Sequence, residues 1–136
     1  MNELALNLIQ IAGLALLAIL FLQSGLDKIV DFKGNLTWLK GHFAQTMFKN
    51  LVPSLLIVIT LIEISAGLFS ALSAALFMIP ELNEYAVLTG VMGAANALLA
   101  LLCLFFGQRI AKDYAGAASL VPYFLVSGLT LFVVSL

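Results

Sequence analysis

The sequence predicts an all-α integral membrane protein: a four transmembrane helix bundle with an interfacial helix in its first connection. Of the 136 residues, 63% are hydrophobic and only 10% are charged, whereas a soluble domain carries about a quarter charged residues. The apolar residues gather in four stretches, each long enough for the roughly 20 residues that a helix needs to cross a bilayer. A single domain, 1–136, accounts for the whole length.

The transmembrane helices are expected at 4–26, 52–79, 86–106 and 117–136. The first follows Met1-Asn2-Glu3, without the basic residues that open a signal peptide, and is expected to be retained. Pro53 falls in the first turn of the second helix, where a missing N–H is tolerated, and Pro80 closes that helix. Pro122 lies in the first turns of the fourth helix, with the same tolerance.

The first connection is the longest, and residues 36–50 within it have the pattern of an amphipathic helix. Apolar residues recur there at helical spacing: Leu36, Leu39, Phe43, Met47 and Leu51. Lys40 and Lys49 can face water. This pattern predicts a helix that lies in the headgroup region.

The basic residues predict the orientation of the chain. All six lie in the first and third connections: Lys28, Lys33, Lys40, Lys49, Arg109 and Lys112. The second connection, PELNEY (80–85), and both termini have none. The positive-inside rule therefore predicts a cytoplasmic location for the first and third connections and an outside location for both termini.

Composition excludes several function classes. A net charge of −1 without a basic patch argues against a nucleic-acid partner. Cys103 is the only cysteine, so the chain cannot form a dithiol pair, and Cys103 is expected to be a small buried residue. His42 has no neighbours at metal-ligand spacing, so no metal site is expected and an interfacial role is favoured. The sequence offers no haem, iron–sulfur or flavin site of its own.

Two stripes of small and polar residues run along the second and third helices. One stripe holds Thr60, Glu63, Gly67, Ser70 and Ala74; the other holds Thr89, Gly93, Asn96, Ala100, Cys103 and Gly107. Small residues let helices approach closely in lipid, so Gly67, Gly93 and Ala100 are expected to be packing residues.

Glu63 is the only charged residue between Lys49 and Glu81. We expect it to be protonated and hydrogen-bonded to Asn96, because no basic residue is expected at the same depth. Glu63 and Asn96, with Lys28 at the end of the first helix, are the candidates for an intramembrane proton or quinone site. The alternatives are a purely structural hydrogen bond at Glu63, and ordinary snorkelling or pairing with Asp31 for Lys28.

Three stretches together resemble the DoxX family, and the resemblance covers nearly the whole chain. They are SGLDKIVDF (24–32), IEISAGL (62–68) and AKDYAGAASLVPYFLVSG (111–128). By this resemblance the family's Gly-x-x-Lys feature falls on Gly25 and Lys28, and its helix-two glutamate and glycine fall on Glu63 and Gly67. The resemblance implies a small bacterial cytoplasmic (inner) membrane protein. Some relatives are subunits of thiosulfate:quinone oxidoreductases, and others are linked to thiol or oxidative-stress complexes.

The leading functional hypothesis is a membrane subunit of a quinone- or thiol-linked redox system. In it, Glu63, Asn96 and Lys28 line a buried polar site that contacts a quinone or a proton. No cofactor is expected to be bound by this chain alone, so at most it is one subunit of an oxidoreductase complex. The expected partners are the lipid bilayer and a homo-oligomer or larger membrane complex. The alternatives are a non-enzymatic assembly subunit and, ranked lower, a small proton-coupled transporter.

Overall fold

The computed structural model describes residues 2–136, which are mostly helical and contain no strand. The elements are α1 (Glu3–Val30), α2 (Phe32–His42), α3 (Val52–Leu76), the short 3-10 helix η1 (Pro80–Leu82), α4 (Asn83–Ile110), α5 (Tyr114–Ser119) and α6 (Val121–Val134). Four segments are long and apolar enough to cross a membrane: α1, α3, η1 with α4, and α5 with α6. The predicted all-helical architecture with four long apolar helices is confirmed, and these helices fit a multi-pass membrane protein.

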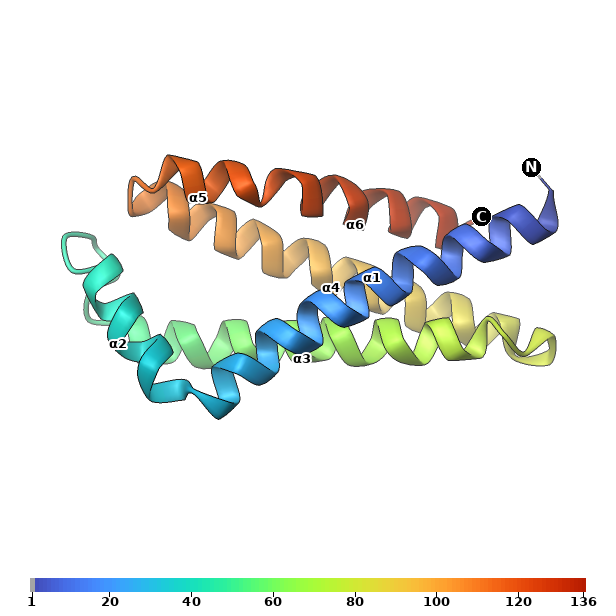
Figure 1. Cartoon of the computed structure of the whole chain (residues 1–136), viewed down its shortest axis with the longest axis horizontal. Coiled ribbons are helices and arrows are strands. Elements are labelled where there is room, and N and C mark those ends of the chain that lie inside the picture. Colours follow the sequence, from blue (N-terminus) through green and yellow to red (C-terminus); the bar gives the residue numbers. More distant parts are fainter. Residues whose placement is uncertain (1) are drawn as a thin grey trace.

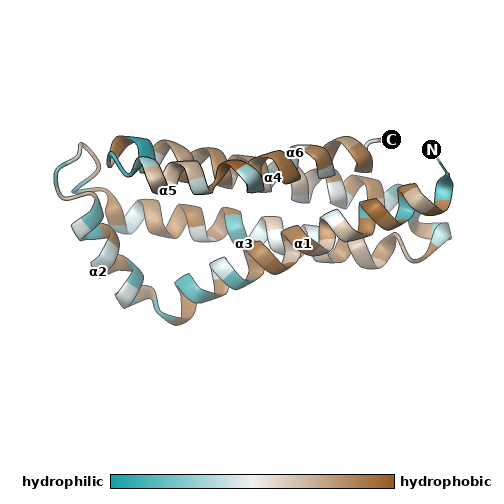
Figure 2. Ribbon diagram, turned by 45° about the horizontal axis from the view of Figure 1, so that its top comes forward, coloured by the Kyte–Doolittle hydropathy of each residue, from teal (hydrophilic) through white to brown (hydrophobic). Residues whose placement is uncertain are grey.

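The long helices form one bundle in which α3 packs against both α1 and α4, and α6 packs against α4 and α1. Both termini lie at one end, and α2 lies at the other (Figure 1). All six lysines and arginines lie in the segments at the α2 end, which we call the basic end. Figure 2 shows the hydrophobic residues along the long helices and hydrophilic residues gathered around α2 and the helix ends.

Several helix boundaries differ from the predicted ones. Helix α1 continues to Val30 instead of ending at 26, so Lys28 belongs to the helix. Helix α3 ends at Leu76, earlier than 79, and the turn made by η1 lets α4 begin at Asn83 and run to Ile110 instead of 86–106. The predicted helix at 117–136 is divided into α5 and α6, because Pro122 has no N–H to donate to the Ala118 carbonyl.

The helix of the first connection is displaced toward the N-terminus relative to the predicted 36–50. The Gly34 N–H donates to Asp31 Oδ1 at 3.2 Å, which starts α2 at Phe32. Helix α2 ends at His42, and turns continue to Leu51. None of its residues is buried, so α2 lies on the outside of the bundle.

Close helix contacts depend on small residues. A Cβ at Gly67 would lie 2.9 Å from the Leu22 backbone nitrogen, and a Cβ at Gly93 would lie 2.8 Å from that of Ser70. These positions bring α3 against α1 and against α4. Ala100 is fully buried in the central apolar cluster of the bundle.

Candidate functional site: the Lys28–Glu63 pair and an apolar pocket

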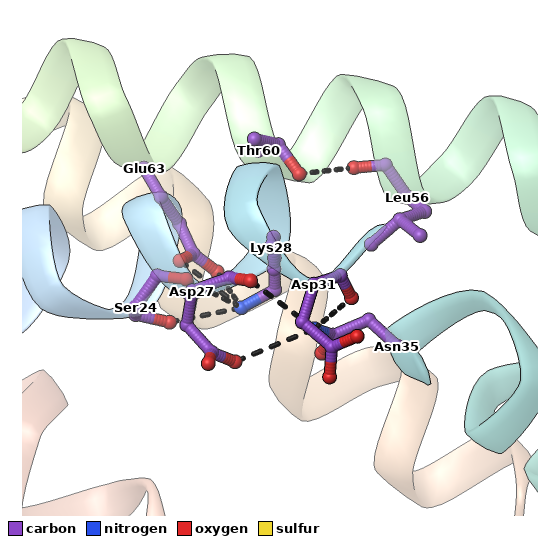
Figure 3. Close-up of polar contacts among 8 residues, drawn as sticks. All are labelled: Ser24, Asp27, Lys28, Asp31, Asn35, Leu56, Thr60 and Glu63. Atoms are coloured by element: carbon purple, nitrogen blue, oxygen red, sulfur yellow. Dashed lines mark hydrogen bonds and ion pairs between the residues drawn. The ribbon is translucent and has the colours of Figure 1, made fainter. Parts of the chain in front are cut away.

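Glu63 forms an ion pair with Lys28 inside the bundle. The Glu63 side chain is 0% exposed and that of Lys28 is 15% exposed. Lys28 Nζ lies 3.1 Å from Oε1 and donates a hydrogen bond to Oε2 at 3.2 Å (Figure 3). It also donates to Ser24 Oγ at 2.9 Å, one turn back along α1. The expectation that no cation reaches the depth of Glu63 is therefore wrong.

A close crossing of α1 and α3 makes this pair possible. A Cβ at Gly25 would lie 2.5 Å from Ile64 Cδ1 and 3.4 Å from the Ile64 backbone nitrogen. Lys28 follows Gly25 by three residues and therefore lies on nearly the same face of α1. Gly25 thus brings the ammonium group within reach of a carboxylate that has no other charged partner in residues 2–136.

Lys28 does not pair with Asp31, contrary to one of the sequence-based alternatives. Asp31 lies at the junction of α1 and α2, where its carboxylate caps α2 and its N–H donates to the Asp27 carbonyl at 2.9 Å. Side chains on a helix tilt toward its N-terminus, which carries Lys28 back toward Ser24 and into the bundle. The alternative that Lys28 extends its ammonium group into water is also wrong, because its side chain is only 15% exposed and pairs with Glu63.

The predicted Glu63–Asn96 hydrogen bond is wrong as well. Asn96 Nδ2 donates to Ser65 Oγ at 2.8 Å. The close contact of Gly93 with Ser70 fixes the antiparallel register of α4 on α3, and this register brings Asn96 level with Ser65. Glu63 points to α1 instead. The structure therefore assigns these two candidate residues to different interfaces of α3.

A pocket with a volume of about 370 Å³ lies beside Lys28, among α1, α2, α3 and α4. Its walls are mostly apolar, and α3 contributes only aliphatic side chains to them. The lining residues are Lys28, Asn35, Trp38, Leu39, His42, Phe43, Phe48, Val52, Leu55, Leu56, Val58, Ile59, Ile62, Cys103, Leu104, Phe106, Gly107 and Gln108. Glu63 is not among them, so Lys28 separates the buried carboxylate from the pocket.

A second polar group of the pocket is formed by His42 and Gln108. His42 Nε2 lies 2.6 Å from Gln108 Oε1, and its ring stacks on Trp38 with a centroid distance of 4.5 Å. The turn after α4 places Gln108 and Asp113 together, because the Asp113 N–H donates to the Gln108 carbonyl at 2.9 Å while Lys112 takes the left-handed conformation. Asp113 Oδ2 lies 3.9 Å from His42 Nε2.

Sequence reasoning did not find Gln108 or Asp113, and it assigned His42 only an interfacial role. His42 and Gln108 are 66 residues apart, and neither belongs to a recognisable motif. Cys103 was expected to be buried, but it is exposed and lines the pocket. Within residues 2–136 no group of three potential ligand side chains could hold a metal ion.

The hydrogen-bonding groups that the arrangement presents to an apolar space include the Lys28 ammonium and the His42 imidazole. An ammonium group can donate to an oxygen acceptor of a bound molecule, and its charge is balanced from behind by Glu63. No family model, curated protein or solved structure matches this chain. The DoxX resemblance therefore stays a prediction.

Proposed function

We propose that the protein is a quinone-binding membrane subunit of a redox system, with the electron carriers on a partner subunit. The observation that carries this proposal is the double role of Lys28, which lines an apolar pocket and is neutralised by a carboxylate outside that pocket. The resemblance to the DoxX family, whose Gly-x-x-Lys and glutamate features fall on Gly25, Lys28 and Glu63, supports the same proposal.

The chemistry of the pocket suits a quinone. A quinone combines an apolar ring and tail with carbonyl oxygens that accept hydrogen bonds, and the pocket combines apolar walls with the Lys28 ammonium. The volume of about 370 Å³ lies within the range of small-molecule sites, roughly 300–1,000 Å³. A quinone is favoured over a thiol as the reacting molecule, because a dithiol exchange within this chain would need a second cysteine beside Cys103.

A second candidate is a non-enzymatic assembly subunit. The Lys28–Glu63 pair joins α1 to α3 at a close crossing, and this observation favours a role in fixing the helix arrangement. In that case the pocket holds only lipid chains. The binding experiment that follows separates the two candidates.

Decylubiquinone titrated into the protein in lipid nanodiscs is expected to quench the fluorescence of Trp38 in a saturable manner. Trp38 is the only tryptophan and lines the pocket, so the signal reports on this location. A quinone that merely dissolves in the bilayer quenches without saturation. Steady-state fluorescence at fixed protein and increasing decylubiquinone measures the difference.

The matched control is the double variant Trp38→Phe/Tyr85→Trp. It moves the fluorophore to the opposite end of the bundle at a similar exposure, because Tyr85 is 60% exposed and Trp38 is 59% exposed. The control is expected to show only the non-saturating component. Unsaturable quenching in both proteins would leave the assembly role as the better explanation.

We further propose that the protein belongs to a bacterial cytoplasmic membrane, with its basic end in the cytoplasm and both termini outside. The gathering of all six lysines and arginines at the basic end supports this orientation. Helix α2 then lies at the cytoplasmic interface. A reporter enzyme fused to the C-terminus is expected to be active only outside the cytoplasm, and activity inside would reverse the proposed orientation.

A further inference from the structure

We infer that His42 is the residue that exchanges protons with the pocket ligand, and that Gln108 is its positioning residue. The inference rests on the proposed function, because it takes a quinone as the molecule that receives the proton. It assigns to His42 a role that the sequence assigned to the intramembrane carboxylate.

The location of Glu63 argues against a direct proton-exchange role for it. Its side chain is fully buried, is not part of the pocket wall, and contacts the ammonium of Lys28. Of the side chains that line the pocket, Lys28, His42 and Cys103 can titrate. Histidine is the side chain that most readily gains and loses a proton near neutral pH.

The surroundings of His42 fix its ring in one orientation. Trp38 stacks on one face, and Phe43 approaches with its ring perpendicular at a centroid distance of 5.1 Å. Because Gln108 Oε1 is only an acceptor, a contact of 2.6 Å requires that His42 Nε2 carry a hydrogen. In the neutral imidazole, Nδ1 is then the free acceptor. No hydrogen bond engages Nδ1 within the described part of the chain.

Two charged side chains lie near His42. The Asp113 carboxylate lies 3.9 Å from Nε2, and the Lys28 ammonium belongs to the wall of the same pocket. Helix α3 contributes no charged side chain to this wall. The side chains of His42 and Asp113 are 14% and 34% exposed, so protons can reach the ring from water at the basic end.

The step moves one proton. The deprotonated oxygen of a bound hydroquinone anion accepts the proton on Nδ1 of the imidazolium. The Nδ1–H bond breaks, an O–H bond forms on the hydroquinone, and the imidazole is left neutral with its hydrogen on Nε2, held by Gln108. Water then restores the proton on Nδ1.

His42 is the only histidine, so ¹⁵N-histidine labelling gives the Nδ1 and Nε2 resonances of a single imidazole in nanodiscs. We expect the neutral ring to be the Nε2–H tautomer. The variant Gln108→Leu removes the acceptor and is expected to abolish this preference, whereas Gln108→Glu keeps an oxygen acceptor and is expected to preserve it. Decylubiquinone is expected to shift the Nδ1 resonance more than the Nε2 resonance.

The outcomes separate this inference from the proposed function. Saturable quenching of Trp38 together with an unchanged Nδ1 resonance would overturn the role of His42 and leave quinone binding intact. An Nδ1–H tautomer in the unsubstituted protein would also overturn it. Absence of saturable quenching would overturn both. If His42 only contacts the ligand, the affinity for decylubiquinone is expected to be the same at pH values where the imidazole is charged and where it is neutral. If His42 exchanges a proton through Nδ1, this affinity is expected to depend on pH.

Discussion

Lys28→Met is expected to lower the free energy of unfolding by about 3–5 kcal/mol, since removing one partner leaves the other as an uncompensated buried charge. Here the remaining charge is on Glu63, whose side chain is 0% exposed. Glu63→Gln keeps the shape and removes the charge, and combining it with Lys28→Met is expected to recover most of the loss. Circular dichroism during denaturation in mixed micelles measures the effect of each variant.

Lys33→Met is the matched control for Lys28→Met, because Lys33 is an exposed lysine at the same end of the bundle. It is expected to change the unfolding free energy by no more than about 0.5 kcal/mol, as exposed substitutions usually do. Equal effects of Lys28→Met and Lys33→Met, or a double variant no more stable than Lys28→Met, would show that the ion pair does not stabilise the bundle.

Gly93→Ala is expected to destabilise the protein by about 1–3 kcal/mol, the usual range for overpacking a tight contact. The added Cβ would lie 2.5 Å from Ser70 Oγ and 2.8 Å from the Ser70 backbone nitrogen. The hydroxyl can rotate away, but the backbone cannot move without separating α4 from α3. The same denaturation experiment measures this change.

Gly128→Ala provides the control, because a Cβ at Gly128 has no atom within 4 Å. Replacing a helical glycine by alanine in open space stabilises a helix by up to about 1 kcal/mol. The two alanine variants are therefore expected to differ in sign. A stabilising effect of Gly93→Ala would mean that the α3–α4 contact is looser than the structure shows.

The fold was predictable because four long apolar stretches leave few alternatives to a helical bundle. The partners of the polar residues were not predictable, since they depend on helix rotation and register. Asn96 and Glu63 belong to matching stripes, yet the contact of Gly93 with Ser70 places Asn96 beside Ser65. The sequence predicted an interfacial Lys28 because the apolar stretch ends near residue 26. In the structure α1 continues to Val30, and it closely approaches α3 at Gly25.

The polar group formed by His42 and Gln108 depends on a contact between segments that are far apart in the sequence. His42 ends α2, and Gln108 precedes the turn at Lys112, a residue whose left-handed conformation is unusual for a side chain other than glycine. Nothing in the sequence of either helix end predicts its contact with the other. The pocket could be found only once both ends were placed in space.

The most direct test of the account is the dissociation constant of decylubiquinone in the Lys28→Met/Glu63→Gln variant, read from Trp38 fluorescence. This variant removes the ammonium from the pocket wall without leaving a buried charge behind it. Loss of a charge-assisted hydrogen bond costs about 1.5–3 kcal/mol, so the dissociation constant is expected to rise at least about tenfold, while Lys33→Met leaves it unchanged. An unchanged dissociation constant in the double variant would contradict the assignment of Lys28 to the ligand site.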